Sequence, residues 1–197
     1  FRTLTTSDFG IFSAINNIVI VAYSLLDIGI SGSLINFISY HKSRNETAIA
    51  NKYFQAGVFL RGVVSLMVAV IIIVLSKFLG PKFFLTSQTP AIVLAALTIL
   101  VMSFLDLFYY SFQAYQKFLH AAFTSSFYTS LRVALILLLS LTQLPYSITT
   151  VMAILLAAPV VGVAFGWYHL RPKFTARLPD REILKKLLRF SGWLGVT

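Results

Sequence analysis

The sequence predicts an all-α integral membrane protein, a helical bundle of five transmembrane helices plus the start of a further one. Hydrophobic residues make up 58% of the 197 residues and charged residues only 11%. This balance is more apolar than that of soluble domains. Five apolar stretches also reach the roughly 20 residues that a helix needs to cross a bilayer, and they show none of the alternation expected of membrane strands.

The five predicted spans cover residues 9–40, 53–79, 91–114, 121–144 and 148–170. The first is longer than a bilayer requires and contains Gly29 and Gly32, so we expect a bend or a break there, with simple tilting as the alternative. Pro159 predicts a kink in the fifth span. Gly162 and Gly166 form a small-residue face that would let a neighbouring helix approach closely.

The distribution of positive charge predicts the orientation. Three connections carry eleven basic residues on one side of the membrane, whereas the other side has Arg2, Lys77 and Lys82. By the positive-inside rule the eleven face the cytoplasm; they are Lys42, Arg44, Lys52, Lys117, Arg171, Lys173, Arg177, Arg181, Lys185, Lys186 and Arg189. The net charge of +10 therefore indicates contact with anionic membrane lipids and no nucleic-acid partner.

The last basic connection predicts an amphipathic helix. Ile183, Leu184, Leu187 and Leu188 share one helical face, opposite Arg181, Lys185 and Arg189. This segment is either a linker lying on anionic headgroups or the cytoplasmic beginning of the next span. We expect three divisions: a partial N-terminal transmembrane bundle at 1–170, a basic amphipathic cytoplasmic linker at 171–189 and the start of a transmembrane helix at 190–197. The opening Phe1 and the apolar end suggest a fragment.

One ionisable residue lies within each of the first four spans: Asp27, Arg61, Asp106 and Arg132. A charge near the bilayer centre costs a few kcal/mol, about 3, when it faces lipid. Each of the four should therefore face the bundle interior. The absence of cysteine excludes thiol chemistry and thiolate metal sites, and no metal or other cofactor is predicted.

Helical spacing places polar residues beside each of these charges. We expect these polar faces to converge on a shared, hydrated interior. They are Ser13, Asn17, Ser24, Asp27 and Ser31 on the first span, Gly57, Arg61 and Ser65 on the second, Ser103, Asp106, Tyr110 and Gln113 on the third, and Ser125, Tyr128, Thr129 and Arg132 on the fourth. Rise per residue puts Arg61 and Asp106 about 14 and 16 Å deep, and Arg132 and Asp27 both about 22 Å. Two neutral pairs would satisfy the charges. Alternatively, the arginines bind a phosphate-bearing substrate or an aspartate carries a coupling ion.

Three segments carry a family resemblance: RTLTTSDFGIFS before the first span, DIGISGSLINFIS within it, and LLRFSGW after the basic linker. The chain resembles Wzx-type polysaccharide (O-antigen repeat-unit) flippases of the multidrug/oligosaccharidyl-lipid/polysaccharide exporter superfamily. The resemblance implies a two-bundle fold around a central cavity, of which this chain would be the first bundle without its first helix. It also implies transfer of undecaprenyl-pyrophosphate-linked oligosaccharides for lipopolysaccharide synthesis across the bacterial cytoplasmic membrane.

The resemblance also implies roles for individual residues. The cationic cavity of the family would fall on Arg61 and Arg132, and Tyr128, on the polar face of Arg132, joins them in the expected substrate-binding set. Asp27 and Asp106 would serve as ion-coupling or ion-pair residues, with Na⁺ or H⁺ as the possible coupling ion. No catalytic residue is expected.

Two other functions compete with this hypothesis. A cation-coupled drug exporter of the same superfamily would favour acidic residues in the cavity, whereas two acids and two bases are present here. A membrane-embedded polysaccharide polymerase or acyltransferase is disfavoured because His41, His120 and His169 lie at span ends without metal-ligand spacing. A purely structural helical scaffold leaves the four buried charges without a purpose.

Overall fold

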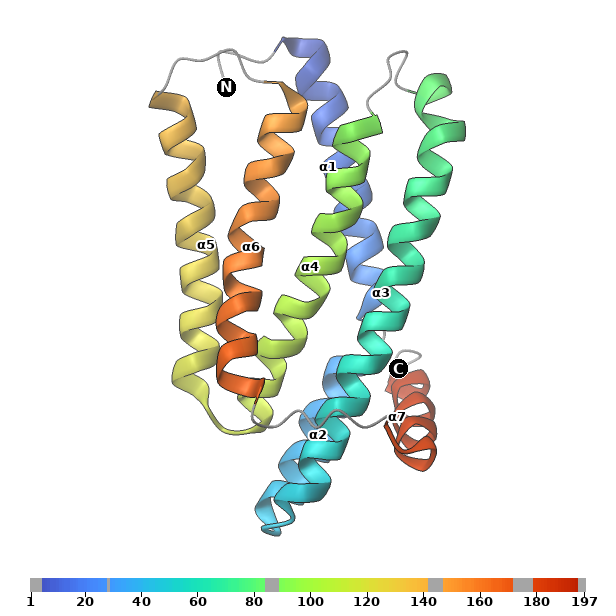
Figure 1. Cartoon of the computed structure of the whole chain (residues 1–197), viewed down its shortest axis with the longest axis vertical. Helices are drawn as coiled ribbons and strands as arrows, with labels where there is room; N and C mark the ends of the chain where they lie inside the picture. Colours follow the sequence, from blue (N-terminus) through green and yellow to red (C-terminus); the bar gives the residue numbers. More distant parts are fainter. Residues whose placement is uncertain (1–4, 28, 84–88, 142–146, 172–178, 195–197) are drawn as a thin grey trace.

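A computed structural model describes residues 5–27, 29–83, 89–141, 147–171 and 179–194. Within these ranges the chain is helical and has no strand (Figure 1). Its helices are α1 (Thr6–Leu26), α2 (Ile30–Ser43), α3 (Thr47–Phe83), α4 (Thr89–Ala114), α5 (Phe118–Leu141), α6 (Ile148–Leu170) and α7 (Arg181–Leu194).

In the described part of the chain, five helices are long and apolar enough to cross a membrane: α1, α4, α5, α6 and the Thr47–Ser76 part of α3. This confirms the predicted class, an all-α protein with five candidate spans. The fifth predicted span, 148–170, coincides with α6, which continues without interruption through Pro159. The predicted fourth span extended to 144, and residues 142–144 lie outside the described residues.

The long first stretch is divided into two helices, as its glycines predicted. α1 ends at Leu26, and α2 begins at Ile30 after Gly29, whose φ of 68° lies in the left-handed region. Glycine adopts this conformation without the Cβ clash that other residues meet. The carbonyl of Gly29 accepts the backbone N–H of Ser33 at 3.0 Å, so a new helix begins at once. Gly32 lies inside α2 and does not interrupt it.

α4 is the centre of the bundle and contacts α1, α2, α3, α5 and α6. It packs against α6 at the two glycines that the sequence indicated. A Cβ at Gly162 would lie 2.5 Å from Leu105 Cδ1, and a Cβ at Gly166 would lie 2.6 Å from Phe108 Cδ2. The small-residue face therefore packs directly on α4.

α7 lies beside α2 and α3 at one end of the bundle (Figure 1). Ile183 and Leu187 are buried against these helices, and Leu184 packs at the edge of the same cluster. The sequence placed Leu188 on this face as well, but its side chain is 53% exposed. Ile183 and Leu187 are one turn apart and form the side of α7 that contacts α2 and α3, and Leu188 lies outside this side. The predicted boundary at 189/190, between the cytoplasmic linker and the next transmembrane helix, stays a prediction, because α7 continues across it.

The basic connections gather at one end of the molecule. The α2–α3 turn, the α4–α5 turn, the end of α6 and α7 lie at the lower end in Figure 1. The Lys42 Nζ donates to the Tyr115 carbonyl, which joins two of these connections directly. We refer to this end as the basic end; the positive-inside rule predicts that it is cytoplasmic.

Candidate functional site

Arg61 on α3 is the most deeply buried charged residue of the described chain, with none of its surface exposed. Its Nη1 donates to the Leu26 carbonyl oxygen at 2.7 Å and to Asp27 Oδ1 at 3.0 Å. Its Nε donates to the Ser103 carbonyl oxygen of α4 at 3.3 Å. One guanidinium therefore connects α1, α3 and α4.

The break between α1 and α2 explains why Arg61 has these partners. The last carbonyls of a helix lack acceptor partners within the helix, and buried carbonyls require a donor. Arg61 supplies that donor to Leu26 and places a positive charge at the C-terminus of α1, where the helix dipole favours it. Asp27, the residue that follows α1, also accepts a hydrogen bond from the Ser31 hydroxyl of α2.

Asp106 on α4 is the second acid beside Arg61. Its Oδ2 lies 3.9 Å from Arg61 Nη2, too far for a hydrogen bond. The Tyr23 hydroxyl of α1 donates to the same carboxylate oxygen. Within the described residues, the buried atoms Arg61 Nη2, Ser103 Oγ and Ser111 Oγ have no hydrogen-bond partner. Two carboxylates thus share one guanidinium, and Asp27 holds it more closely.

A cleft of about 320 Å³ opens beside Asp106, between α1, α4 and α5. Its wall is rich in hydroxyl groups, which can both donate and accept hydrogen bonds. The lining residues are Tyr23, Met102, Leu105, Asp106, Tyr109, Tyr110, Thr124, Ser125, Tyr128 and Thr129. We call this cavity the tyrosine cleft. A ligand that carries many hydroxyl groups would match its surface.

Arg132 lies one helical turn beyond the tyrosine cleft on α5. Its side chain is partly buried, and its Nη1 donates to the Tyr128 hydroxyl at 3.4 Å. Among the described residues it forms no ion pair. A guanidinium has five N–H donors, so Arg132 retains most of its capacity for an anion.

Comparison with known proteins identifies the family. A family model described as polysaccharide biosynthesis protein matches residues 1–197. The chain belongs to the polysaccharide biosynthesis protein family. No curated protein and no solved structure matches it. The family indicates a part in polysaccharide biosynthesis or transport, and its members are generally transporters rather than enzymes. Together with the five apolar helices, this makes the chain a multi-pass membrane protein.

In this polysaccharide biosynthesis protein the structure brings three of the four predicted charges together. The predicted proximity of Arg61 and Asp106 is confirmed at 3.9 Å. The alternative in which Arg132 pairs with Asp27 is not what the structure forms, because Asp27 pairs with Arg61 at 3.0 Å. Equal depth did not imply proximity: α5 packs on α4 and α6, whereas the contacts of α1 are with α3, α4 and α6.

Sequence reasoning missed several partners in the site. Tyr23 lies four residues before Asp27, and this spacing places both on one face of a helix. The spacing could have indicated that Tyr23 belongs to the site. The carbonyls of Leu26 and Ser103 have no signature in the sequence. His120 and His169, 5.0 Å apart between ring centroids, pack with Phe112 and Phe165 and lie outside the tyrosine cleft.

Proposed function

We propose that the protein is a flippase that moves undecaprenyl-pyrophosphate-linked oligosaccharide repeat units across the bacterial cytoplasmic membrane. The observation that carries this proposal is the partly exposed Arg132, joined through Tyr128 to a cleft lined by hydroxyl groups. The family match supports the connection to polysaccharides. A cationic group next to a hydroxyl-rich wall fits a ligand that combines phosphate with sugar.

Arg132 would lower the electrostatic barrier that the pyrophosphate meets. An anion entering an apolar region loses its hydration, and a fixed guanidinium returns part of this energy through charge-assisted hydrogen bonds. Its planar fork can bind two phosphate oxygens at once, which a lysine ammonium does not do. The hydroxyls of Tyr128 and its neighbours would exchange hydrogen bonds with sugar hydroxyls that water bound before.

Arg61, the other arginine of the expected substrate-binding set, has a different environment. Its guanidinium is buried and committed to Leu26, Asp27 and Ser103. Contact with substrate would require α1 to move away from α3. We therefore assign Arg61 to positioning α1 against α3 and α4, and Arg132 with Tyr128 to the substrate.

Asp106 is the acid that a coupling H⁺ or Na⁺ would reach through the tyrosine cleft, because it lines this cavity. Neutralising Asp106 would remove one of the two carboxylates that share Arg61. Asp27 would then be the one carboxylate that pairs with Arg61, and the hydrogen bond from the Tyr23 hydroxyl of α1 to Asp106 would lose its charge assistance. Ion binding in the cleft would in this way change the stability of the α1–α3 contact.

Substitution of Arg132 in the full-length protein tests the proposal. The loss of hydrogen bonds to a charged group, about 1.5–3 kcal/mol, predicts that Arg132→Ala lowers glycan transfer about tenfold or more, at normal membrane abundance. Arg132→Lys keeps the charge without the fork and should retain partial transfer. Transfer of polyprenyl-pyrophosphate oligosaccharide in proteoliposomes measures both variants, with the exposed Arg181→Ala as the control.

Normal glycan transfer by Arg132→Ala at normal abundance would exclude Arg132 from the mechanism. Equal losses of protein and transfer in both variants would instead indicate a structural role. If the parent protein transfers no glycan but exports a cationic dye, the protein is the drug exporter that the sequence left as an alternative.

A further inference from the structure

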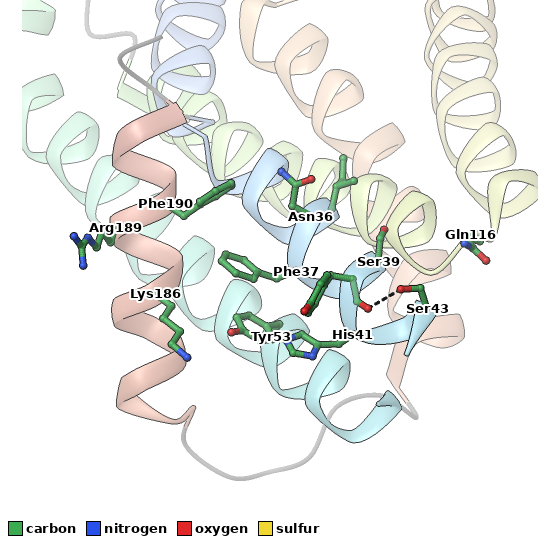
Figure 2. Close-up of a pocket in the computed structure, with 12 residues that line it drawn as sticks. Asn36, Phe37, Ser39, His41, Ser43, Tyr53, Gln116, Lys186, Arg189 and Phe190 are labelled. Carbon is green, nitrogen blue, oxygen red and sulfur yellow. Dashed lines mark hydrogen bonds between the residues drawn. The ribbon is translucent and has the colours of Figure 1, made fainter. Parts of the chain in front are cut away.

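A second cavity of the described chain lies away from the tyrosine cleft, at the basic end. It measures about 1200 Å³ and extends along the outward side of α2, between α7 and the α4–α5 turn (Figure 2). We call it the α2–α7 groove. Its lining combines aromatic rings, small polar groups and cations: Ile35, Asn36, Phe37, Ser39, Tyr40, His41, Ser43, Tyr53, Gln116, Lys186, Arg189 and Phe190.

The aromatic rings of the groove are packed against one another. Phe37 stacks on Tyr53 with ring centroids 4.8 Å apart, and Tyr53 stacks on His41 at 5.2 Å. Phe190 of α7 meets Phe37 edge to face at 5.3 Å. Outside this stack, the Arg44 guanidinium lies 4.4 Å from the centre of the Tyr40 ring. Phe37, Tyr53, His41 and Phe190 therefore form one aromatic wall of the groove.

The charged residues that line the groove are basic. Lys186 extends from α7 on the side nearest Tyr53, and the Arg189 guanidinium points outward at the rim (Figure 2). Neither Asp nor Glu is among the lining residues. The nearby Glu46 is engaged with His41, whose Nδ1 lies 2.6 Å from its Oε2. An anion in the groove would thus meet the positive charge of Lys186, while the Glu46 carboxylate is held on His41.

We propose that the α2–α7 groove binds a membrane phospholipid with a net negative headgroup, and that the Lys186 ammonium contacts its phosphate. Basic pockets between helices on the cytoplasmic side are suited to anionic headgroups, and aromatic side chains favour the membrane interface. The aromatic wall accommodates the glycerol and upper acyl region, and the exposed Asn36 amide offers hydrogen bonds to the headgroup. This site is separate from the proposed transport function and does not depend on it.

Lys185 provides a matched control for Lys186. Both are exposed lysines of α7 with the same charge, but only Lys186 lines the groove. Purified full-length protein in neutral micelles is titrated with phosphatidylglycerol or phosphatidylcholine, and bound lipid is measured by native mass spectrometry. We expect tighter binding of phosphatidylglycerol. Lys186→Gln should weaken it about fivefold, as loss of one interfacial lysine predicts, while Lys185→Gln changes it less than about twofold and Lys186→Arg restores it.

Three results would overturn this site. Equal weakening by Lys185→Gln and Lys186→Gln would indicate general attraction to a basic helix, and equal binding of the two lipids would remove the charge argument. Displacement of phosphatidylglycerol by undecaprenyl phosphate at matched concentration would assign the groove to the transported lipid. Because lipid binding is measured without transport, failure of the flippase proposal leaves this result unaffected, and the converse also holds.

Discussion

Replacing Arg61 with methionine removes the guanidinium that joins α1, α3 and α4 while keeping an unbranched side chain. The Leu26 and Ser103 carbonyls lose their donor, and Asp27 and Asp106 lose their shared cation. Removal of one partner from a buried ion pair costs about 3–5 kcal/mol, because the remaining charge is left unpaired. We expect a loss of this size in the free energy of unfolding of Arg61→Met.

The two acids should not contribute equally. At an effective dielectric constant of about 20, separations of 3.0 and 3.9 Å give attractions of about 5.5 and about 4.3 kcal/mol before desolvation is subtracted. Asp27 adds a charge-assisted hydrogen bond of about 1.5–3 kcal/mol. The Asp27 side chain is 36% exposed against 23% for Asp106, so solvent screens the attraction between Arg61 and Asp27 more strongly. We therefore expect Arg61 to couple more strongly to Asp27, by about 1 kcal/mol.

Double-mutant cycles of Arg61→Met with Asp27→Asn and with Asp106→Asn measure both couplings. Reversible unfolding in mixed micelles gives the free energies, and Lys52→Met, an exposed cation on the same helix, is the control. The reasoning is refuted if Arg61→Met is as stable as the parent protein. Stronger coupling to Asp106 than to Asp27 would refute the assignment of Asp27 as the closer partner.

Two further predictions concern packing and topology. Gly166→Ala should destabilise the bundle by about 1–3 kcal/mol, because the new Cβ would lie 2.8 Å from the Phe108 Cβ, which no rotamer can move. Gly162→Ala meets only the end of the Leu105 side chain and should cost less. Gly10→Ala, with nothing within 4 Å, is the control. If Gly166→Ala and Gly10→Ala have equal free energies of unfolding, α6 and α4 do not approach each other closely at Gly166. For topology, an impermeant thiol reagent in intact cells should label Thr89→Cys and not Arg44→Cys. The reverse labelling would invert the orientation.

The fold class and the spans followed from sequence because the bilayer imposes a length and an apolar composition on each helix. The break at Gly29 was also accessible, since the backbone there requires a conformation that glycine adopts readily. The small-residue face of Gly162 and Gly166 was likewise predictable, because the two glycines lie one turn apart, whereas α4 as the helix that packs on it was not. These features depend on residues close together in the sequence.

The contacts within the site were harder to predict from the sequence, because they depend on how the helices lie around one another. Depth along the membrane normal is read from residue counts, but lateral position is not. Arg132 and Asp27 illustrate this, since their equal depth allowed a pair that the structure does not form. The role of the Leu26 carbonyl could not be predicted for another reason. Every residue has a carbonyl, and only the end of α1 makes this one an acceptor for Arg61.

The broken first span and the buried Arg61 are two parts of one arrangement. A helix that ends inside the bundle exposes carbonyls that need donors, and the nearest acid would add negative charge to the negative end of the helix dipole. Arg61 offsets both, and it binds Asp27 and the Leu26 carbonyl through the same Nη1 atom. Because Asp106 lies 3.9 Å from the other terminal nitrogen, a change of its charge acts on the guanidinium that positions α1. The end of α1 is therefore the element through which ion binding in the tyrosine cleft would alter the bundle.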